Sequence, residues 1–105
     1  MGENILADVQ KKIGDLFFEW DSEKAEKNIR KHGISFETAG KVFQDTSIIE
    51  LFDSLHSDTE QRMIAIGMVD DILSVVYTER HEETIRLISA RKATKKERSM
   101  YYEQF

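Results

Sequence analysis

The chain has 105 residues, a length typical of one domain with one modest hydrophobic core. It contains no cysteine, which excludes disulfides and thiolate metal sites, and its net charge of -5 at pH 7 argues against a simple nucleic-acid-binding protein. The N-terminus carries no signal-peptide pattern and no apolar run approaches the ~20 residues of a membrane span, so we expect a cytoplasmic protein without a membrane partner.

The charge is distributed unevenly along the sequence. Residues 22–33 carry four Lys or Arg against two Glu, residues 84–105 carry six against two, and residues 34–60 carry one Lys against six acids. Such asymmetry can build one basic face on an acidic protein, and the local field is what steers a polyanion. The alternative is that both basic stretches are solvated helix surfaces.

The first predicted element is a short amphipathic helix over residues 4–16. Its apolar residues recur mostly three or four positions apart, which is the period of a helix with one buried face. Gly14 weakens the last turn of this helix. We therefore divide the chain into an N-terminal helical extension, residues 1–16, and a main domain, residues 17–105.

A strand and a helix are predicted next. Residues 17–20 form the strand, and Asp21 or Ser22 then caps a helix over residues 24–31. Gly33 is placed to end that helix in a left-handed conformation.

The rest of the chain predicts one more helix, four strands and a last helix. Ser35 caps the helix that buries Phe36, Ala39, Val42 and Phe43; the strands cover residues 48–52, 62–69, 72–77 and 85–90; and Thr94 and Glu97 form the capping box of a helix anchored by Tyr101, Tyr102 and Phe105. Short connections between the strands favour antiparallel hairpins. The order of elements predicts an α+β fold, with helices packed on a curved, mainly antiparallel sheet.

No nucleotide-binding or hydrolase motif occurs in the sequence. A phosphate-binding glycine loop, a nucleophile elbow and a zincin helix are all lacking, and the three histidines do not have the spacing of metal ligands. We therefore expect no metal site and no cofactor. RNA cleavage needs no metal when the 2′-hydroxyl attacks the neighbouring phosphate, because His or Glu can transfer the protons and Arg can neutralise the phosphate charge.

The candidate residues for such chemistry lie near the ends of predicted elements. They are Lys31 and His32 at the end of a helix, Glu60 and Arg62 at the start of a strand, Arg80 at a strand end, Arg86 within the last strand, and Arg91 and Lys92 at its junction with the last helix. Arg86 is expected to point away from Ile85 and Leu87, which share the other face of the strand. A basic pair near a helix start opposes the helix dipole, which favours a role facing an anion.

Structural roles for some of these residues are also open. His32 can contribute to the C-terminal cap of its helix, where its imidazole would meet the last carbonyls. Glu60 and Arg62 can form an exposed ion pair worth under ~1 kcal/mol.

Several blocks of sequence occur in an order that resembles a known family. They are Phe18-Glu19-Trp20-Asp21, Asn28, Lys31-His32-Gly33, Phe36, Val42-Phe43-Gln44-Asp45, Glu60-Gln61-Arg62, Ile66-Gly67, Val76-Tyr77-Thr78-Glu79-Arg80 and Arg86-Leu87-Ile88-Ser89-Ala90-Arg91-Lys92-Ala93. Over roughly residues 17–102 the chain resembles the BrnT family of type II toxins. The resemblance implies a RelE-like fold and a metal-independent endoribonuclease that cleaves RNA and inhibits translation.

The resemblance also implies partners and site residues. A BrnA-type antitoxin would neutralise the toxin, and the complex would contact DNA only through the antitoxin. Carried over to this sequence, the resemblance points to Lys31, His32, Glu60, Arg62, Arg80 and Arg91. We assign proton transfer to Glu60 or His32, binding of the scissile phosphate to Arg62, Arg80 and Arg91, and further substrate binding to Lys31, Arg86 and Lys92.

Two features depart from the family, and they keep other functions open. Residues 3–16 precede the usual start of the family, and the acidic total charge is unusual for a protein that approaches RNA. The alternative function is a non-catalytic, toxin-like interaction module that only binds a protein partner. A direct DNA-binding regulator is disfavoured by the net charge and by the lack of a helix-turn-helix signature.

Overall fold

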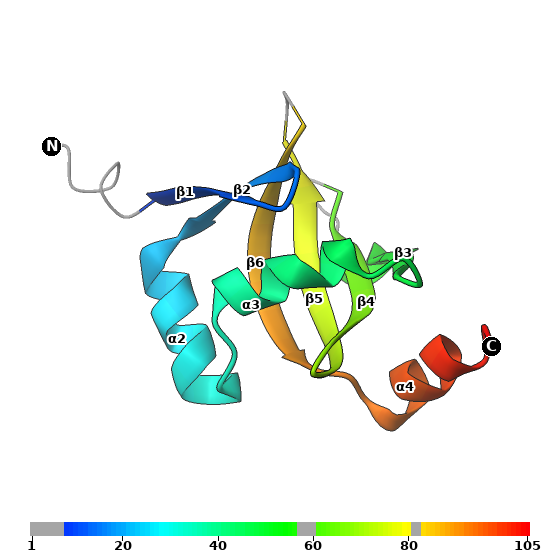
Figure 1. The fold of residues 1–105 in the computed structure, drawn as a ribbon. Coiled ribbons are helices and arrows are strands. Elements are labelled where there is room, and N and C mark those ends of the chain that lie inside the picture. Colours follow the sequence, from blue (N-terminus) through cyan, green and yellow to red (C-terminus); the bar gives the residue numbers. More distant parts are fainter. Residues whose placement is uncertain (1–7, 57–60, 81–82) are drawn as a thin grey trace, which may run out of the picture.

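In the computed structural model, residues 8–56, 61–80 and 83–105 are described, and they form a six-stranded mixed sheet with three α-helices (Figure 1). The strands, in the order in which they lie in the sheet, are β1 (Asp8–Ile13), β2 (Leu16–Asp21), β6 (Thr84–Lys92), β5 (Asp71–Glu79), β4 (Met63–Val69) and β3 (Ile49–Phe52). The helices are α2 (Ser22–His32), α3 (Phe36–Gly40) and α4 (Lys95–Tyr102), with 3-10 turns η1 (Lys41–Gln44) and η2 (Ser54–His56). No helix among the described residues is long and apolar enough to cross a membrane.

Strand β1 stands where the sequence predicted a helix. It pairs antiparallel with β2 through the two-residue turn Gly14-Asp15, in which Gly14 has a positive φ of 61° that only glycine adopts without cost. Val9 and Ile13 pack against the core from one side of β1. Their four-residue spacing suits both structures, because four is close to the helical period of 3.6 and is also a multiple of two. The helix prediction is therefore wrong for β1, and its first residues lie outside the described part of the chain.

The segment that follows β2 forms as predicted. Asp21 caps α2 by accepting a hydrogen bond from the backbone N–H of Glu23 at 2.8 Å. Gly33 ends the helix with a φ of 72°, and Ser35 caps α3. These local signals fix the lengths of the two helices, and α3 continues as η1 up to Asp45.

Most strands pair with the next strand along the chain, but β2 pairs with β6, which is distant in the sequence. Strands β3, β4, β5 and β6 are consecutive antiparallel neighbours, as their short connections predicted. Strand β2 instead lies parallel to β6, so the sheet is mixed. A register shift in the β5–β6 pairing leaves Ile88 as an extra residue in β6.

The two faces of the sheet differ in how they are covered. Helices α2 and α3 and the turn η1 cover one face, here called the helical face (Figure 1). Its core consists of Phe18, Trp20, Ile34, Phe36, Ala39, Val42, Ala65, Leu73, Val75, Tyr77, Ile85, Leu87 and Ala90. On the opposite face, here called the open face, the one helix that the described residues supply is α4, which covers one end, where Tyr101 packs on Ile66 and Ile72.

Helix α4 begins as predicted but is anchored by one aromatic residue rather than three. Thr94 and Glu97 form the expected capping box. Tyr101 is buried, and its hydroxyl donates a hydrogen bond to Asp45 at 2.5 Å. Tyr102 and Phe105 stay 50% and 79% exposed, so of the three predicted aromatic anchors only Tyr101 is buried against the sheet.

Candidate functional site

A row of polar side chains crosses four strands on the open face. Glu19 of β2 is the register partner of Arg86 of β6, and Arg86 is the register partner of Thr78 of β5. The Thr78 hydroxyl donates a hydrogen bond to the backbone carbonyl of Gln61 at 2.8 Å, which places Arg62, the next residue, beside it. We call Glu19, Arg86, Thr78 and Arg62 the polar row.

The alternation of side chains along the strands directs the polar row outward. The residues on either side of Glu19 and Arg86 are buried on the helical face: Phe18, Trp20, Ile85 and Leu87. Adjacent side chains of a strand point to opposite faces, so the neighbours of these apolar residues must leave the core. The predicted orientation of Arg86 is confirmed.

Two arginines converge on one carboxylate in this row. Arg86 donates a hydrogen bond from Nη1 to Oε2 of Glu19 at 2.7 Å, and its Nη2 lies 3.4 Å from Oδ1 of Asp8. Arg80 joins the same carboxylate, with its Nε 3.8 Å from Oε2 of Glu19. Partial burial by itself would lower the pKa of Arg86, but hydrogen bonds to Glu19 and Asp8 raise it above its ordinary value. Arg86 is therefore held as a cation that is still 21% exposed.

Arg62 closes the row at the start of β4. Its carbonyl accepts a hydrogen bond from the backbone N–H of Asp53 at 2.8 Å, which extends the β3–β4 pairing by one residue. A shallow pocket of about 290 Å³ adjoins this end of the row and is lined by Gln61, Met63, Thr78, Glu79 and Arg80. Glu60, a predicted catalytic residue, lies outside the described residues. His81 and Glu82, which precede β6, also lie outside the described residues.

Arg91 and Lys92 lie at the other end of the open face. Arg91 pairs in register with Ser74 and is five residues from Arg86 along β6, roughly 16 Å in an extended strand. Its guanidinium donates to both oxygens of Glu97, at 2.8 and 3.2 Å, and these hydrogen bonds raise the pKa of Arg91. Glu97 thus neutralises the positive charge that opposes the dipole of α4. The structure does not bring Arg91 together with Arg80 and Arg86.

Lys31 and His32 lie in the helical layer, in the last turn of α2. One turn earlier the buried Asn28 fastens α2 to β6, because its carboxamide bonds both the N–H and the C=O of Ala90, at 3.0 and 2.9 Å. This carboxamide takes the place of strand pairing at Ala90, because β2 pairs only with the first three residues of β6, Thr84 to Arg86. Lys31 and His32 therefore belong to the part of the molecule next to Ala90, away from the polar row.

Glu19 is the site residue that the sequence did not predict. The sequence block from Phe18 to Asp21 indicates a strand with two core aromatic residues, Phe18 and Trp20. The alternation of side chains along a strand places Glu19 on the face opposite to these aromatics, but it does not say what Glu19 contacts there. The missing information was the parallel pairing that puts this carboxylate next to Arg86. Among the described residues, no three His, Asp or Glu side chains are placed to hold a metal ion. The chemistry available in the row is that of guanidinium and carboxylate groups.

These features define a small α+β protein with a guanidinium-rich row on the sheet face opposite α2 and α3, an arrangement suited to phosphate groups. The model of the family described as the ribonuclease toxin, BrnT, of type II toxin-antitoxin systems matches residues 20–97. The chain belongs to this family of ribonuclease toxins. Membership of a type II toxin-antitoxin family implies an antitoxin protein as its partner.

A solved structure agrees with this assignment. The crystal structure of the Brucella abortus ribonuclease toxin, BrnT, is similar to this chain with 28% sequence identity and a TM-score of 0.55. The similarity covers 72% of this chain and 94% of that chain. The comparison with curated proteins found no match. Strand β1 lies before the range of the family match.

Proposed function

We propose that this protein is a metal-independent endoribonuclease that inhibits translation by cleaving RNA. The observation that carries the proposal is the convergence of Arg80 and Arg86 on Glu19, beside Arg62, on the face that α2 and α3 leave open. The planar guanidinium fork donates paired hydrogen bonds to phosphate oxygens. Such a group of arginines gives an acidic protein a local site for a polyanion.

The reaction uses a nucleophile that the RNA itself supplies. The 2′-oxygen forms a bond to the neighbouring phosphorus, the bond from phosphorus to the 5′-oxygen breaks, and a 2′,3′-cyclic phosphate results. Arg62, Arg80 and Arg86 hold the non-bridging oxygens and stabilise the charge that develops on them. Glu19 is a positioning residue, because its carboxylate orients the two guanidinium groups that it contacts.

Proton transfer completes the reaction. A base takes the proton of the 2′-hydroxyl and an acid gives a proton to the leaving 5′-oxygen. We assign proton transfer to Glu60, which precedes Arg62 by two residues in the sequence, rather than to His32, because His32 lies in the helical layer away from the polar row. Lys31, Arg91 and Lys92 lie away from the row in the fold, and we assign them to flanking phosphates.

The partner and the cellular setting extend the proposal. We infer that the antitoxin implied by the family is BrnA-type, that it neutralises the toxin, and that any contact of the complex with DNA is made through it. The toxin then acts in the cytoplasm, where its RNA substrate is found. We also propose that the fold is related to that of RelE-like ribonucleases. The packing of helices on one face of the sheet supports this relation.

Alanine substitutions in the site test the ribonuclease proposal. Each of Arg62→Ala, Arg80→Ala and Arg86→Ala should slow the cleavage of single-stranded RNA in EDTA by about 100-fold or more and relieve growth arrest. Arg98→Ala is the matched control, because Arg98 is also ion-paired, at 2.8 Å from Asp71, and is as exposed as Arg80 but lies on α4. It should cleave like the unaltered protein.

The outcomes separate the competing functions. Thermal unfolding of each variant distinguishes a lost site from a lost fold. Full cleavage by all three arginine variants contradicts the site, and cleavage that stops in EDTA contradicts metal independence. An unaltered protein that binds its antitoxin but neither cleaves RNA nor arrests growth is the non-catalytic interaction module instead.

A further inference from the structure

The β1–β2 hairpin adds a surface to the open face next to the polar row. Gln10 of β1 is the register partner of Glu19, and Lys12 is the register partner of Phe17. Phe17 in turn pairs with Thr84 of β6, two residues before Arg86. Register partners in a sheet point to the same face. These side chains of the hairpin therefore continue the face on which Glu19 and Arg86 lie.

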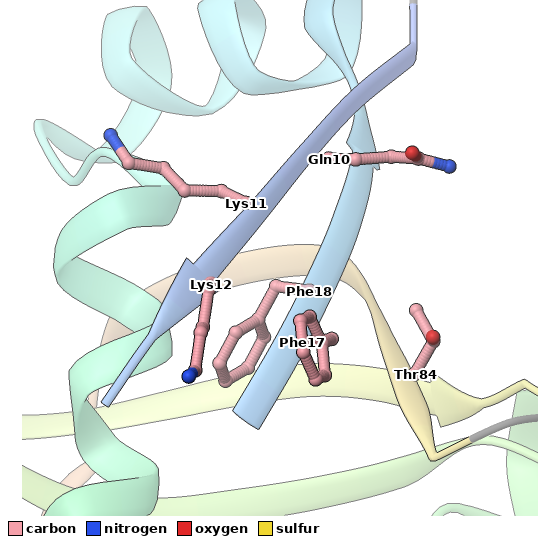
Figure 2. Close-up of a pocket in the computed structure, with 6 residues that line it drawn as sticks. All are labelled: Gln10, Lys11, Lys12, Phe17, Phe18 and Thr84. Atoms are coloured by element: carbon pink, nitrogen blue, oxygen red, sulfur yellow. The ribbon is translucent and has the colours of Figure 1, made fainter. Parts of the chain in front are cut away.

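A shallow pocket of about 530 Å³ lies at this hairpin (Figure 2). Its lining consists of Gln10, Lys11, Lys12, Phe17, Phe18 and Thr84. Figure 2 shows Gln10 and Thr84 on one side of β2 and Lys11 on the other side, toward α3. The volume is within the ~300–1,000 Å³ range of small-molecule sites, so the pocket can accept a group the size of a nucleobase.

Phe17 gives this pocket an aromatic surface that the core does not use. Its ring is 53% exposed, whereas the ring of the next residue, Phe18, is buried in the core. The ammonium of Lys12 lies 5.7 Å from the centroid of the Phe17 ring. A single exposed Phe is ordinary on a protein surface. Here, however, the ring has a lysine above it, and the amide of Gln10 and the hydroxyl of Thr84 line the same pocket. Arg86 follows Thr84 by two residues. This combination of groups is suited to a nucleotide.

We propose that this pocket is a nucleobase subsite for single-stranded RNA. An unpaired base stacks on Phe17, the flexible ammonium of Lys12 moves from the ring to a neighbouring phosphate, and Gln10 and Thr84 bond the edge of the base. The subsite rests on the proposed ribonuclease function, because it holds the nucleotide beside the one whose phosphate Arg80 and Arg86 bind. A double helix does not suit the pocket, since its bases are stacked on each other and not on a protein ring.

The ligand chemistry favours RNA over a protein partner. Lys12 lies over the exposed ring, and a polyanion satisfies this cation while its bases cover the apolar ring. Lys11 also lines the pocket but is turned toward α3, where its ammonium lies 3.8 Å from Glu37. The pocket is also continuous with the polar row along β2 and β6. Strand β1 and Phe17 lie before residues 20–97, the range that the family model matches, whereas Thr84 lies within it.

Binding of a non-cleavable RNA tests the subsite. The probe is a short single-stranded RNA that the protein cuts, with a 2′-O-methyl group at the cut site and 2-aminopurine next to it. Phe17→Leu should weaken binding about tenfold and abolish the quenching of 2-aminopurine fluorescence, because it removes the stacking ring but keeps an apolar side chain. Phe17→Tyr keeps the ring and should bind like the unaltered protein. Phe52→Leu is the matched control, since Phe52 is also 53% exposed but lies in β3 at the opposite edge.

Each outcome supports or overturns the subsite. Unchanged binding and quenching in Phe17→Leu overturn it and leave the ribonuclease function intact. Unchanged RNA binding with a weakened antitoxin complex also overturns it and assigns the pocket to the protein interface. An unaltered protein that neither cuts nor binds RNA overturns the ribonuclease function and the subsite together.

Discussion

The helical face and the open face of the sheet are made by the same strands, yet they carry different chemistry. On the helical face, Phe18 and Trp20 are almost completely buried under α2 and α3. On the open face, the residue between them, Glu19, holds two arginines. A strand whose side chains alternate can therefore serve the core and the site at once. It follows that substitution of Trp20 should mainly lower the stability of the fold, whereas substitution of its neighbour Glu19 should mainly lower the activity.

Trp20→Ala should have the largest effect on stability, because it breaks the helical face. The indole is 2% exposed and meets Phe36 of α3 edge to face, with ring centroids 5.9 Å apart. Truncation leaves a large cavity under α3, which we expect to lower the free energy of unfolding by about 3–5 kcal/mol. Urea unfolding followed by circular dichroism measures this loss. A loss below about 1 kcal/mol would contradict the assignment of Trp20 to the core.

The sequence predicts the local parts of this fold well. Asp21, Gly33, Ser35 and the Thr94 capping box act within a few residues, so the helix ends that they set follow from sequence alone. The antiparallel order of strands β3, β4, β5 and β6 also follows from the sequence, because each strand pairs with the next one along the chain. Strand β1 was missed because its apolar spacing is shared by both periods, although the Gly14-Asp15 turn was a usable signal for a hairpin.

The candidate site is less visible in the sequence because it is assembled from distant segments. The basic residues were identified by type, and the orientation of Arg86 followed from its apolar neighbours. The contact of Arg86 with Glu19 joins residues 67 positions apart through a parallel pairing that no local period encodes. Arg91 is a different case, because its partner is local: its charge suggested an anion site, but Glu97, six residues later on the helix that follows, pairs with it.

Asp45→Asn tests how firmly α4 covers its end of the open face. The Asp45 carboxylate accepts hydrogen bonds from the Tyr101 hydroxyl and from the backbone N–H groups of Met68 and Ser47. Burial by itself would raise the pKa of Asp45, but these hydrogen bonds lower it below its usual 3.8. The lowered pKa means that the folded state favours the ionised carboxylate. Its stabilising contribution is therefore complete above about pH 3.8 and is lost as the pH falls through the lower pKa of the folded state.

The measurement is the difference in stability between Asp45→Asn and the unaltered protein as a function of pH. We expect the variant to be about 1 kcal/mol less stable at pH 7, and the difference to shrink when thermal unfolding is repeated below pH 4. Tyr101→Phe removes the hydroxyl donor while keeping the ring, so it should reproduce part of the loss. A difference that stays constant between pH 7 and pH 3 would show that the charge of Asp45 is unimportant.

Glu19→Gln should have the smallest effect on stability and a large effect on activity. Its ion pair with Arg86 is partly open to solvent, so loss of the charge should change the free energy of unfolding by no more than about 1 kcal/mol. Arg80 and Arg86 then lose the carboxylate that orients them, and misplaced charge-stabilising groups can slow a reaction by about 10- to 100-fold. We expect the loss in kcat, with KM little changed, because the cations that attract RNA remain. Glu19 and Trp20 are adjacent in the sequence, so the two variants compare the two faces directly. If Glu19→Gln loses as much stability as Trp20→Ala, or keeps full kcat, then the assignment of the core to the helical face and of the site to the open face is contradicted.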